Sequence, residues 1–370
     1  MMFRRGLAIL TRVVGGPPSW YSGTPSGQWA ALPGQTLSAS GVLQTGDEAI
    51  LSAWGGGIYN TVGLYDGATW VPGVFLILWG GGHGDSSSNA VYAFGPMNTD
   101  TPTWRRLRDR TSPAPNNTSE DGSGNPVSRH TYQSIAYDPV HNWMFSSGGL
   151  ARHSDANGII ETHTFQFNTA SPNVNQPWTK KTNAPGAADV SAYDNVSGLI
   201  WSHQDAQNQV QAYNTGTDTW SSDTFKSPGW SGGNACSAID TTLGLWAIKW
   251  NAGLNFFRTT STANDYYTPS QTGTAPTGTT SILYDPVAGA FKCWNGNGKQ
   301  LFTLTPPGTS PYQGGNAWTW SSTTPSGGAT PDAAQINGTY GRFGYVDNGD
   351  GLRGYFLFNS STGSVYCYKP

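Results

Sequence analysis

Short apolar runs alternate with turn residues along most of the chain, and the same order of runs returns six times. Each copy opens with a run that ends in an aromatic or aliphatic residue and then an Asp. The six openings are Gly63–Asp66, Ile135–Asp138, Ser191–Asp194, Ser237–Asp240, Ile282–Asp285 and, with one inserted residue, Phe343–Asp347. Self-similarity at a spacing of tens of residues is typical of repeat architectures.

A second apolar run follows each Asp, and a third run with alternating polarity follows the second. The second runs are Val74–Trp79, Trp143–Phe145, Leu199–Trp201, Leu245–Ile248, Ala290–Trp294 and Tyr355–Phe358. The third runs are Ala90–Phe94, His163–Phe167, Val210–Tyr213, Leu254–Phe257, Leu301–Leu304 and Val365–Tyr368. Period-2 alternation bounded by Gly, Asn, Asp and Pro indicates β-strands. Each copy is therefore predicted to form a small antiparallel sheet.

A fourth element with an aromatic residue closes most copies. These residues are Trp104, Trp178, Trp220, Trp318 or Trp320, and Tyr266 or Tyr267. The sixth copy reaches Pro370 before it supplies this element, but Gly27–Leu32 has the missing form. We therefore predict an all-β, six-bladed β-propeller over residues 20–370, a single domain in which the N-terminal strand completes the last blade. Closure of the ring removes free sheet edges, which would otherwise invite aggregation.

At this point the chain resembles the kelch-type β-propellers and is similar to the central domain of the galactose oxidase family. The stretches that carry the resemblance are Leu78–Asp85, Val91–Phe94 and Trp104 in the first copy, and Arg129–Tyr132, Phe145–Gly149 and Trp178 in the second. The likeness spans Trp29 to Lys369, but the paired Gly occurs only in the first two copies. Galactose oxidase-like chemistry would need a copper site with a Tyr cross-linked to a Cys. No Cys neighbours the His-rich loops, so the resemblance implies the fold and not the activity.

Composition and charge exclude some classes of binding partner. The chain has 370 residues with 49 Gly, 16 Trp, 11% charged residues and a net charge of -3. It has no basic cluster beyond Arg105–Arg106, which argues against nucleic acid as a partner. It also has no apolar stretch long enough to cross a bilayer. Three widely spaced cysteines, Cys236, Cys293 and Cys367, fit neither a disulfide framework nor a zinc site, so we expect buried thiols.

The first residues imitate a secretion signal, with basic residues before an apolar patch in Met1–Val14. Arg12 interrupts a run that is too short for a signal, and no small-x-small cleavage site follows cleanly. We therefore expect no cleaved signal peptide. We interpret residues 1–19 as an arm that docks the propeller on other subunits of a larger assembly, in a virion or outside the cell.

The repeat order assigns turns to faces. In an up-and-down blade, turns after strands one and three lie on one face and turns after strands two and four on the other. The Asp turns belong to the first face, where Asp usually binds nearby backbone N–H groups, so we expect a structural role. Five of the six histidines belong to the second face: His83, His130, His153, His163 and His203. Three of them begin a His-x-Asp spacing with Asp85, Asp155 and Asp205, whereas the other three copies place Asn251, Asn295 and Asn359 there.

Two interpretations of this second face remain open. In the functional one, imidazoles and carboxylates form a ligand site, a metal centre or an acid–base pair. In the structural one, each Asp accepts a hydrogen bond from its own His or from loop amides. Equivalent residues on neighbouring sheets lie about 10 Å apart, so equivalent histidines reach one ion only if their loops lean inward. The candidate ligand-binding residues are Trp54, His83, Asp85, Arg129, His130, His153, Asp155, His203, Asp205 and Trp230.

Aromatic residues suggest what such a site would bind. Trp54 and Trp230 are flanked by Gly and Ser and are the Trp residues most expected to be exposed, and flat aromatic faces beside polar groups suit sugar rings. Our first hypothesis is a non-catalytic recognition or structural propeller of a phage tail or capsid, which binds a glycan receptor or a protein through this loop-rich face. The alternative is a carbohydrate-active enzyme in which His130, His153, His163 or His203 acts as acid–base or metal ligand. Arg129 or Arg152 would grip a carboxylate there. No cofactor is expected beyond a metal ion in that alternative.

Overall fold

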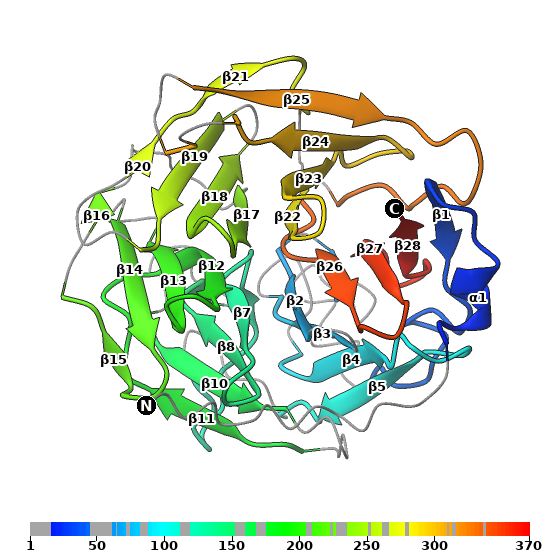
Figure 1. Ribbon diagram of the computed structural model, residues 1–370. Coiled ribbons are helices and arrows are strands. Elements are labelled where there is room, and N and C mark those ends of the chain that lie inside the picture. The colour runs from blue at the N-terminus through cyan, green and yellow to red at the C-terminus, as the bar shows by residue number, and fades with distance from the viewer. Residues whose placement is uncertain are drawn as a thin grey trace, which may run out of the picture.

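The structure is a computed structural model. It describes residues 16–44, 61–63, 65–71, 75–81, 88–111, 119–151, 160–167, 175–204, 209–222, 225–226, 235–250, 253–260, 266–277, 281–308, 311–312, 316–335 and 338–370. These residues form six small antiparallel sheets arranged in a ring, a six-bladed β-propeller with almost no helix (Figure 1). The predicted fold class is confirmed. No helix of the described residues is long and apolar enough to span a bilayer.

The first three blades run from the inner to the outer strand in chain order. Blade 1 contains β2 (Gly67–Val71), β3 (Phe75–Trp79), β4 (Val91–Gly95) and β5 (Thr103–Arg108). Blade 2 contains β7 (Ile135–Asp138), β8 (Trp143–Ser147), β10 (Thr162–Gln166) and β11 (Trp178–Lys181). Blade 3 contains β12 (Ala188–Asp194), β13 (Leu199–Gln204), β14 (Gln209–Asn214) and β15 (Thr219–Trp220), with β16 (Phe225–Lys226) also paired to β14.

The last three blades follow the same plan. Blade 4 contains β17 (Ala235–Asp240), β18 (Leu245–Trp250), β19 (Gly253–Arg258) and β20 (Tyr266–Tyr267). Blade 5 contains β22 (Ser281–Asp285), β23 (Ala290–Trp294), β24 (Leu301–Thr305) and β25 (Ala317–Thr323), and β21 (Ser270–Thr272) pairs with β25 in parallel. Blade 6 contains β26 (Phe343–Asp347), β27 (Arg353–Leu357), β28 (Tyr366–Lys369) and the N-terminal β1 (Gln28–Ala31), which follows the short helix α1 (Ser19–Ser22).

The two ends of the chain close the ring, as the sequence predicts. β1 pairs antiparallel with β28, so that Gln28 lies opposite Lys369 and Ala31 opposite Tyr366. Trp29 is 1% exposed, and its indole N–H donates to the Lys299 carbonyl of blade 5 at 3.0 Å. Closure therefore joins blades 5 and 6 as well as the two termini.

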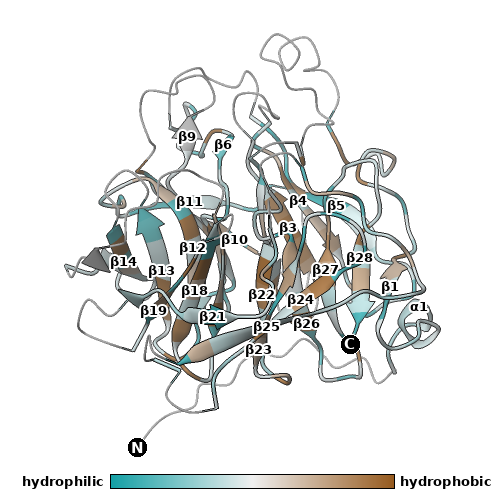
Figure 2. Cartoon of the chain, turned by 90° about the horizontal axis from the view of Figure 1, so that it is seen from above, coloured by the Kyte–Doolittle hydropathy of each residue, from teal (hydrophilic) through white to brown (hydrophobic). Residues whose placement is uncertain are grey.

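Aromatic side chains fill the spaces between blades. Trp79 of blade 1 lies 4.8 Å from Trp178 of blade 2, and Phe256 of blade 4 stacks on Trp318 of blade 5 at 4.5 Å. Figure 2 shows the ring from its side, with the apolar strands between its two faces. A two-stranded pair, β6 (Arg129–His130) and β9 (Leu150–Ala151), lies at one of these faces. We call this the histidine face, and the opposite one, where β7 and β12 end at Asp138 and Asp194, the aspartate face.

The Asp turns have the expected structural role in blades 2 to 6. The carboxylates of Asp138, Asp194, Asp240, Asp285 and Asp347 each accept backbone N–H groups of the residues that follow, at 2.8–3.3 Å. Such bonds close the turn without any ligand.

The first copy of the repeat was predicted wrongly. Tyr65 and Asp66 precede β2 instead of ending it, so Asp66 lies on the histidine face. There its backbone carbonyl accepts a hydrogen bond from Arg342 of blade 6. A Cβ on Gly67 would lie 2.2 Å from the Tyr132 carbonyl oxygen, so the strand has to begin with Gly. In the sequence β2 is followed by Pro72–Gly73, a dipeptide that is itself a turn signal, but these two residues lie outside the described residues.

Candidate ligand-binding face

The histidine face holds every predicted site residue that the structure describes. Arg129, His130, His163 and His203 all lie at this face and are each 0–1% exposed. Eight other predicted residues lie outside the described residues: Trp54, His83, Asp85, Arg152, His153, Asp155, Asp205 and Trp230. The sixth histidine, His141, lies on the aspartate face, where its Nδ1 is 2.7 Å from Asp138 Oδ2.

The buried Arg129 side chain donates hydrogen bonds to backbone carbonyls of blade 2. Its Nη1 donates to the carbonyls of Glu161 at 3.1 Å and Gly148 at 3.3 Å, and its guanidinium lies 5.3 Å from the centre of the Trp79 ring. Its Nη2 lies 3.0 Å from His163 Nδ1. Burial lowers the pKa of Arg129 to about 10, which still leaves it charged at neutral pH. The predicted carboxylate-gripping side chain is thus engaged by backbone carbonyls and a histidine.

His163 is held as a neutral imidazole. Arg129 can only donate, so Nδ1 of His163 accepts, and the ring proton lies on Nε2, 3.1 Å from Glu120 Oε1. Lys180 Nζ lies 2.8 Å from the same Glu120 oxygen. Burial, followed by the charges of Arg129 and Lys180, lowers the pKa of His163 to about 2. Sequence reasoning missed Glu120, although it lies in the connection between β5 and β6, shortly before Arg129.

His203 pairs with a different carboxylate from the one that its His-x-Asp spacing suggests. Its Nδ1 lies 2.7 Å from Asp189 Oδ1, and both side chains are buried. Asp189 lies on β12, beside Val190, which is the register partner of His203 on β13. The signal that could have found it is register, because residues near the start of strand one face residues near the end of strand two.

Four aromatic rings meet on the histidine face around blade 1. His130 stacks on Tyr65 with ring centres 3.8 Å apart, and Tyr132 lies 5.7 Å from both rings. Tyr340 of blade 6 contacts Tyr132 edge-on at 5.7 Å. His130 and Tyr340 are buried, whereas Tyr65 and Tyr132 are half-buried. We call these four residues the aromatic cluster.

Two members of the aromatic cluster have strained backbones. Tyr132 has φ 47° and Tyr340 has φ 42°, which are uncommon for bulky side chains. Each follows a Thr whose carbonyl accepts the N–H of the third residue on, from Ser134 in one turn and from Arg342 in the other. Sequence reasoning missed this pair. The dipeptide Thr-Tyr, repeated shortly before the inner strands of blades 2 and 6, is the signal that could have found it.

Neighbouring polar groups hold both turns in place. Thr131 Oγ1 accepts the N–H of Gly67 at 2.7 Å and donates to the Trp79 carbonyl at 3.2 Å, while Tyr132 N–H donates to the Tyr65 carbonyl at 3.0 Å. The buried Arg342 donates to the carbonyls of Gly338 and Phe358 at 2.8 and 3.1 Å. The surrounding blades therefore determine the conformation of the Thr-Tyr turns.

The described residues contain no group of three or more His, Cys, Asp or Glu side chains placed to hold a metal ion. The three cysteines are buried free thiols, as the sequence predicts, and burial raises the pKa of Cys293.

The comparisons with known proteins leave the function open. No family model matches the chain, and no curated protein matches it. Among solved structures, YjhT is 10% identical with a TM-score of 0.49, over 82% of this chain and 93% of that one. A structural genomics protein of unknown function from Bacteroides thetaiotaomicron is 12% identical with a TM-score of 0.49, over 92% of this chain and 75% of that one. Neither is described as a kelch protein or a galactose oxidase, so that finer resemblance stays a prediction.

Proposed function

We propose that this chain is a non-catalytic recognition propeller that binds a glycan through its histidine face. The observation that carries the proposal is the pair of strained turns that place Tyr132 and Tyr340 against each other. A left-handed conformation costs a residue with a side chain about 1–2 kcal/mol. Strain of this kind persists where the surrounding structure enforces it, and it clusters at ligand clamps and active sites.

The chemistry of the aromatic cluster favours a glycan over a protein partner. Tyr65 and Tyr132 are half-buried, so each offers part of a flat ring beside a hydroxyl group. A sugar ring has apolar C–H faces and a fringe of hydroxyls that match such a surface. The predicted binding residues Arg129 and His130 would then support this surface from below, since both are buried and His130 stacks on Tyr65.

A glycan array with wild type and Tyr132→Asn tests this function. Asn adopts positive φ more easily than Tyr, so the variant removes the ring without adding backbone strain. We expect it to keep the folded ring, seen by circular dichroism, and to lose at least about tenfold in glycan affinity. Val287→Ala, at an exposed residue of the aspartate face, is the control and should keep the array profile. Equal binding by wild type and Tyr132→Asn, or binding of a protein and no glycan, would overturn the proposal.

We further propose that residues 1–19 mount the propeller on a phage virion as a tail or capsid component, where the histidine face would meet a receptor outside the cell. The support is the apolar arm between basic residues in the sequence, and the attachment of Ser19, whose N–H donates to Asp100 at 2.6 Å. Deletion of residues 1–15 should leave the ring folded and abolish its co-purification with virions. Unchanged incorporation of the truncated protein would refute this.

The enzyme alternative has less support. His163 is held neutral and bonded on both ring nitrogens, so it is poorly suited to exchange protons with a substrate near neutral pH. His130 and His203 are enclosed as well. Hydrolysis of a glycan that the array identifies, lost in His130→Gln or His203→Gln, would promote the enzyme instead.

A further inference from the structure

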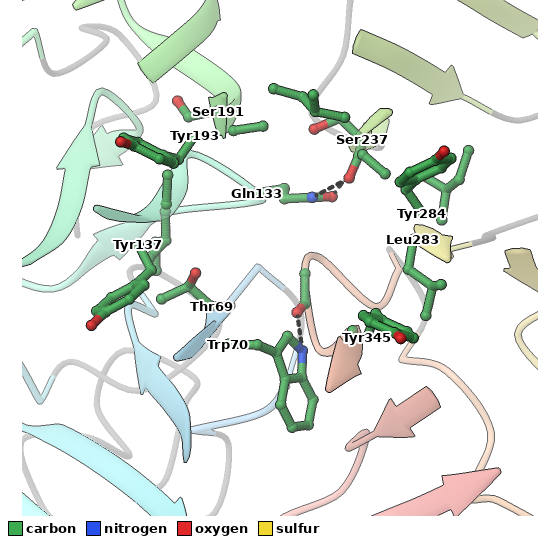
Figure 3. Close-up of a pocket in the computed structure, with 18 of the residues that line it drawn as sticks. Thr69, Trp70, Gln133, Tyr137, Ser191, Tyr193, Ser237, Leu283, Tyr284 and Tyr345 are labelled. Carbon is green, nitrogen blue, oxygen red and sulfur yellow. Dashed lines mark hydrogen bonds between the residues drawn. The ribbon is translucent and has the colours of Figure 1, made fainter. Parts of the chain in front are cut away.

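A second candidate site lies on the ring axis, away from the aromatic cluster. A cavity of about 360 Å³ is lined by the inner strands of all six blades, β2, β7, β12, β17, β22 and β26 (Figure 3). Four tyrosines near the ends of these strands line it: Tyr137, Tyr193 and Tyr284 directly precede the repeated Asp, and Tyr345 lies two residues before it. Figure 3 shows the hydroxyls of Tyr137, Tyr193 and Tyr284 pointing away from the axis. The rings themselves therefore form the sides of the cavity.

Gln133 forms the floor of this cavity at the histidine face. It follows the strained Tyr132, and its side chain reaches across to blade 4 (Figure 3). There its Nε2 donates to the Ser237 carbonyl at 2.8 Å, and its Oε1 accepts the Ser237 N–H at 2.9 Å. At the other end the cavity reaches Pro139, Asn195 and Thr241, which lie within the Asp turns, directly after the Asp residues. The cavity is therefore a pocket that opens on the aspartate face.

The described walls of the pocket are uncharged. Among the residues that the structure describes, those lining the pocket include no Asp, Glu, Lys, Arg or His. Burial, followed by nearby carboxylates, raises the pKa of each of the four tyrosines to about 12, so their phenols stay neutral. The carboxylates of Asp138, Asp194 and Asp240 lie behind the walls and are bonded to their own turns. An anion in the pocket would be repelled by these carboxylates.

The floor offers hydrogen bonds to a ligand. Ser237 is 4% exposed, and its Oγ has no hydrogen-bond partner among the described residues. A side-chain amide has two donors and two acceptor positions, so the pairing of Gln133 with Ser237 leaves one of each for a ligand. Aromatic sides over a neutral polar floor match a ring with apolar faces and several hydroxyls.

We propose that this axial pocket binds an uncharged saccharide ring, independently of the glycan site proposed for the histidine face. Its hydroxyls would bond to Ser237 and Gln133, and its C–H faces would pack against the tyrosine rings. None of the four residues of the aromatic cluster lines the pocket, so the two proposed sites are built from different residues.

Saturation-transfer NMR with the full chain tests the pocket. The probes are methyl glucoside, methyl galactoside and methyl mannoside as neutral rings, glucuronate as the anion and choline as the cation. We expect transfer to at least one neutral ring, and binding of glucuronate and choline at least about tenfold weaker. Absence of transfer to every neutral ring, or tighter binding of glucuronate or choline, would overturn the proposal.

Two variants place the binding in the pocket. Ser237→Ala removes the floor hydroxyl, and Tyr193→Ala removes one wall, and each should weaken the neutral ring at least about tenfold while the thermal midpoint shows that the ring stays folded. Tyr132→Asn, on the histidine face, is the matched control and should keep this binding. If Tyr132→Asn abolishes saccharide binding and both pocket variants keep it, the axial site is refuted and the histidine face is supported. The reverse result supports the axial site alone.

Discussion

Replacement of His163 by Gln should flatten the dependence of stability on pH. In the folded protein His163 accepts a hydrogen bond from Arg129 on Nδ1 and lies 3.1 Å from Glu120 on Nε2. The carbonyl oxygen of Gln can accept from Arg129, and its amide can donate to Glu120. The variant therefore keeps the pattern of donors and acceptors and removes the group that titrates.

The magnitude follows from proton linkage. Burial lowers the pKa of His163 from 6.5 to about 2, so below pH 6.5 the unfolded chain binds a proton that the folded chain does not. Stability therefore falls as the pH falls, by about 1.4 kcal/mol for each pH unit below 6.5. Between pH 7 and pH 5 this one residue should remove about 2 kcal/mol from the free energy of unfolding. The same loss should be missing from His163→Gln.

Urea unfolding followed by Trp fluorescence at pH 7, 6 and 5 measures this difference. Contributions from other titrating groups are shared by wild type and variant, so they cancel in the comparison. NMR of the imidazole C–H protons gives a second measurement, in which the His163 signal should not shift between pH 7 and pH 5. An equal loss of stability in both proteins, or a His163 signal that titrates near pH 6, would refute the buried neutral imidazole.

Two further substitutions test the ring. Trp29→Ala should lower the free energy of unfolding, measured in urea, by about 3–5 kcal/mol. The Trp29 side chain is 1% exposed and joins the closing strand to blade 5, so the substitution leaves a cavity there. A decrease below about 1 kcal/mol would contradict that role. Gly148→Ala should be strongly destabilising, since Gly148 has φ 78° and a Cβ there would lie 2.0 Å from the Ala188 backbone nitrogen. Gly198→Ala is the matched control, because Gly198 has φ 72° and a Cβ there would have nothing within 4 Å. It should lower the free energy of unfolding only by the conformational strain, about 1–2 kcal/mol. Equal losses of stability in the two variants would show that the close approach of blades 2 and 3 does not matter.

Much of the fold could be predicted because its signals are local. Alternation along each strand reports which face of a sheet is buried, and the fixed order of strands then assigns each turn to a face of the ring. That is why the pairing of Gln28–Ala31 with the last strand, and the common face of His130, His163 and His203, follow from the sequence. The copy that was placed wrongly is Tyr65–Asp66. An apolar run before an Asp resembles the end of a strand, but here the strand begins after the Asp, at Gly67, whose backbone lies so close to the Tyr132 carbonyl that a Cβ would not fit.

The candidate sites depended on contacts that sequence spacing does not report. The sequence by itself determined six β units, their closure through the N-terminal strand and the set of residues available on each face, because these follow from periodicity and chain order. Only the tertiary structure decided that His203 pairs with Asp189, that Glu120 reaches His163, and that Tyr132 meets Tyr340 across blade 1. The physical reason is that each of these contacts joins segments brought together by register or by ring closure, at sequence separations of 14, 43 and 208 residues, where no local pattern records the partner.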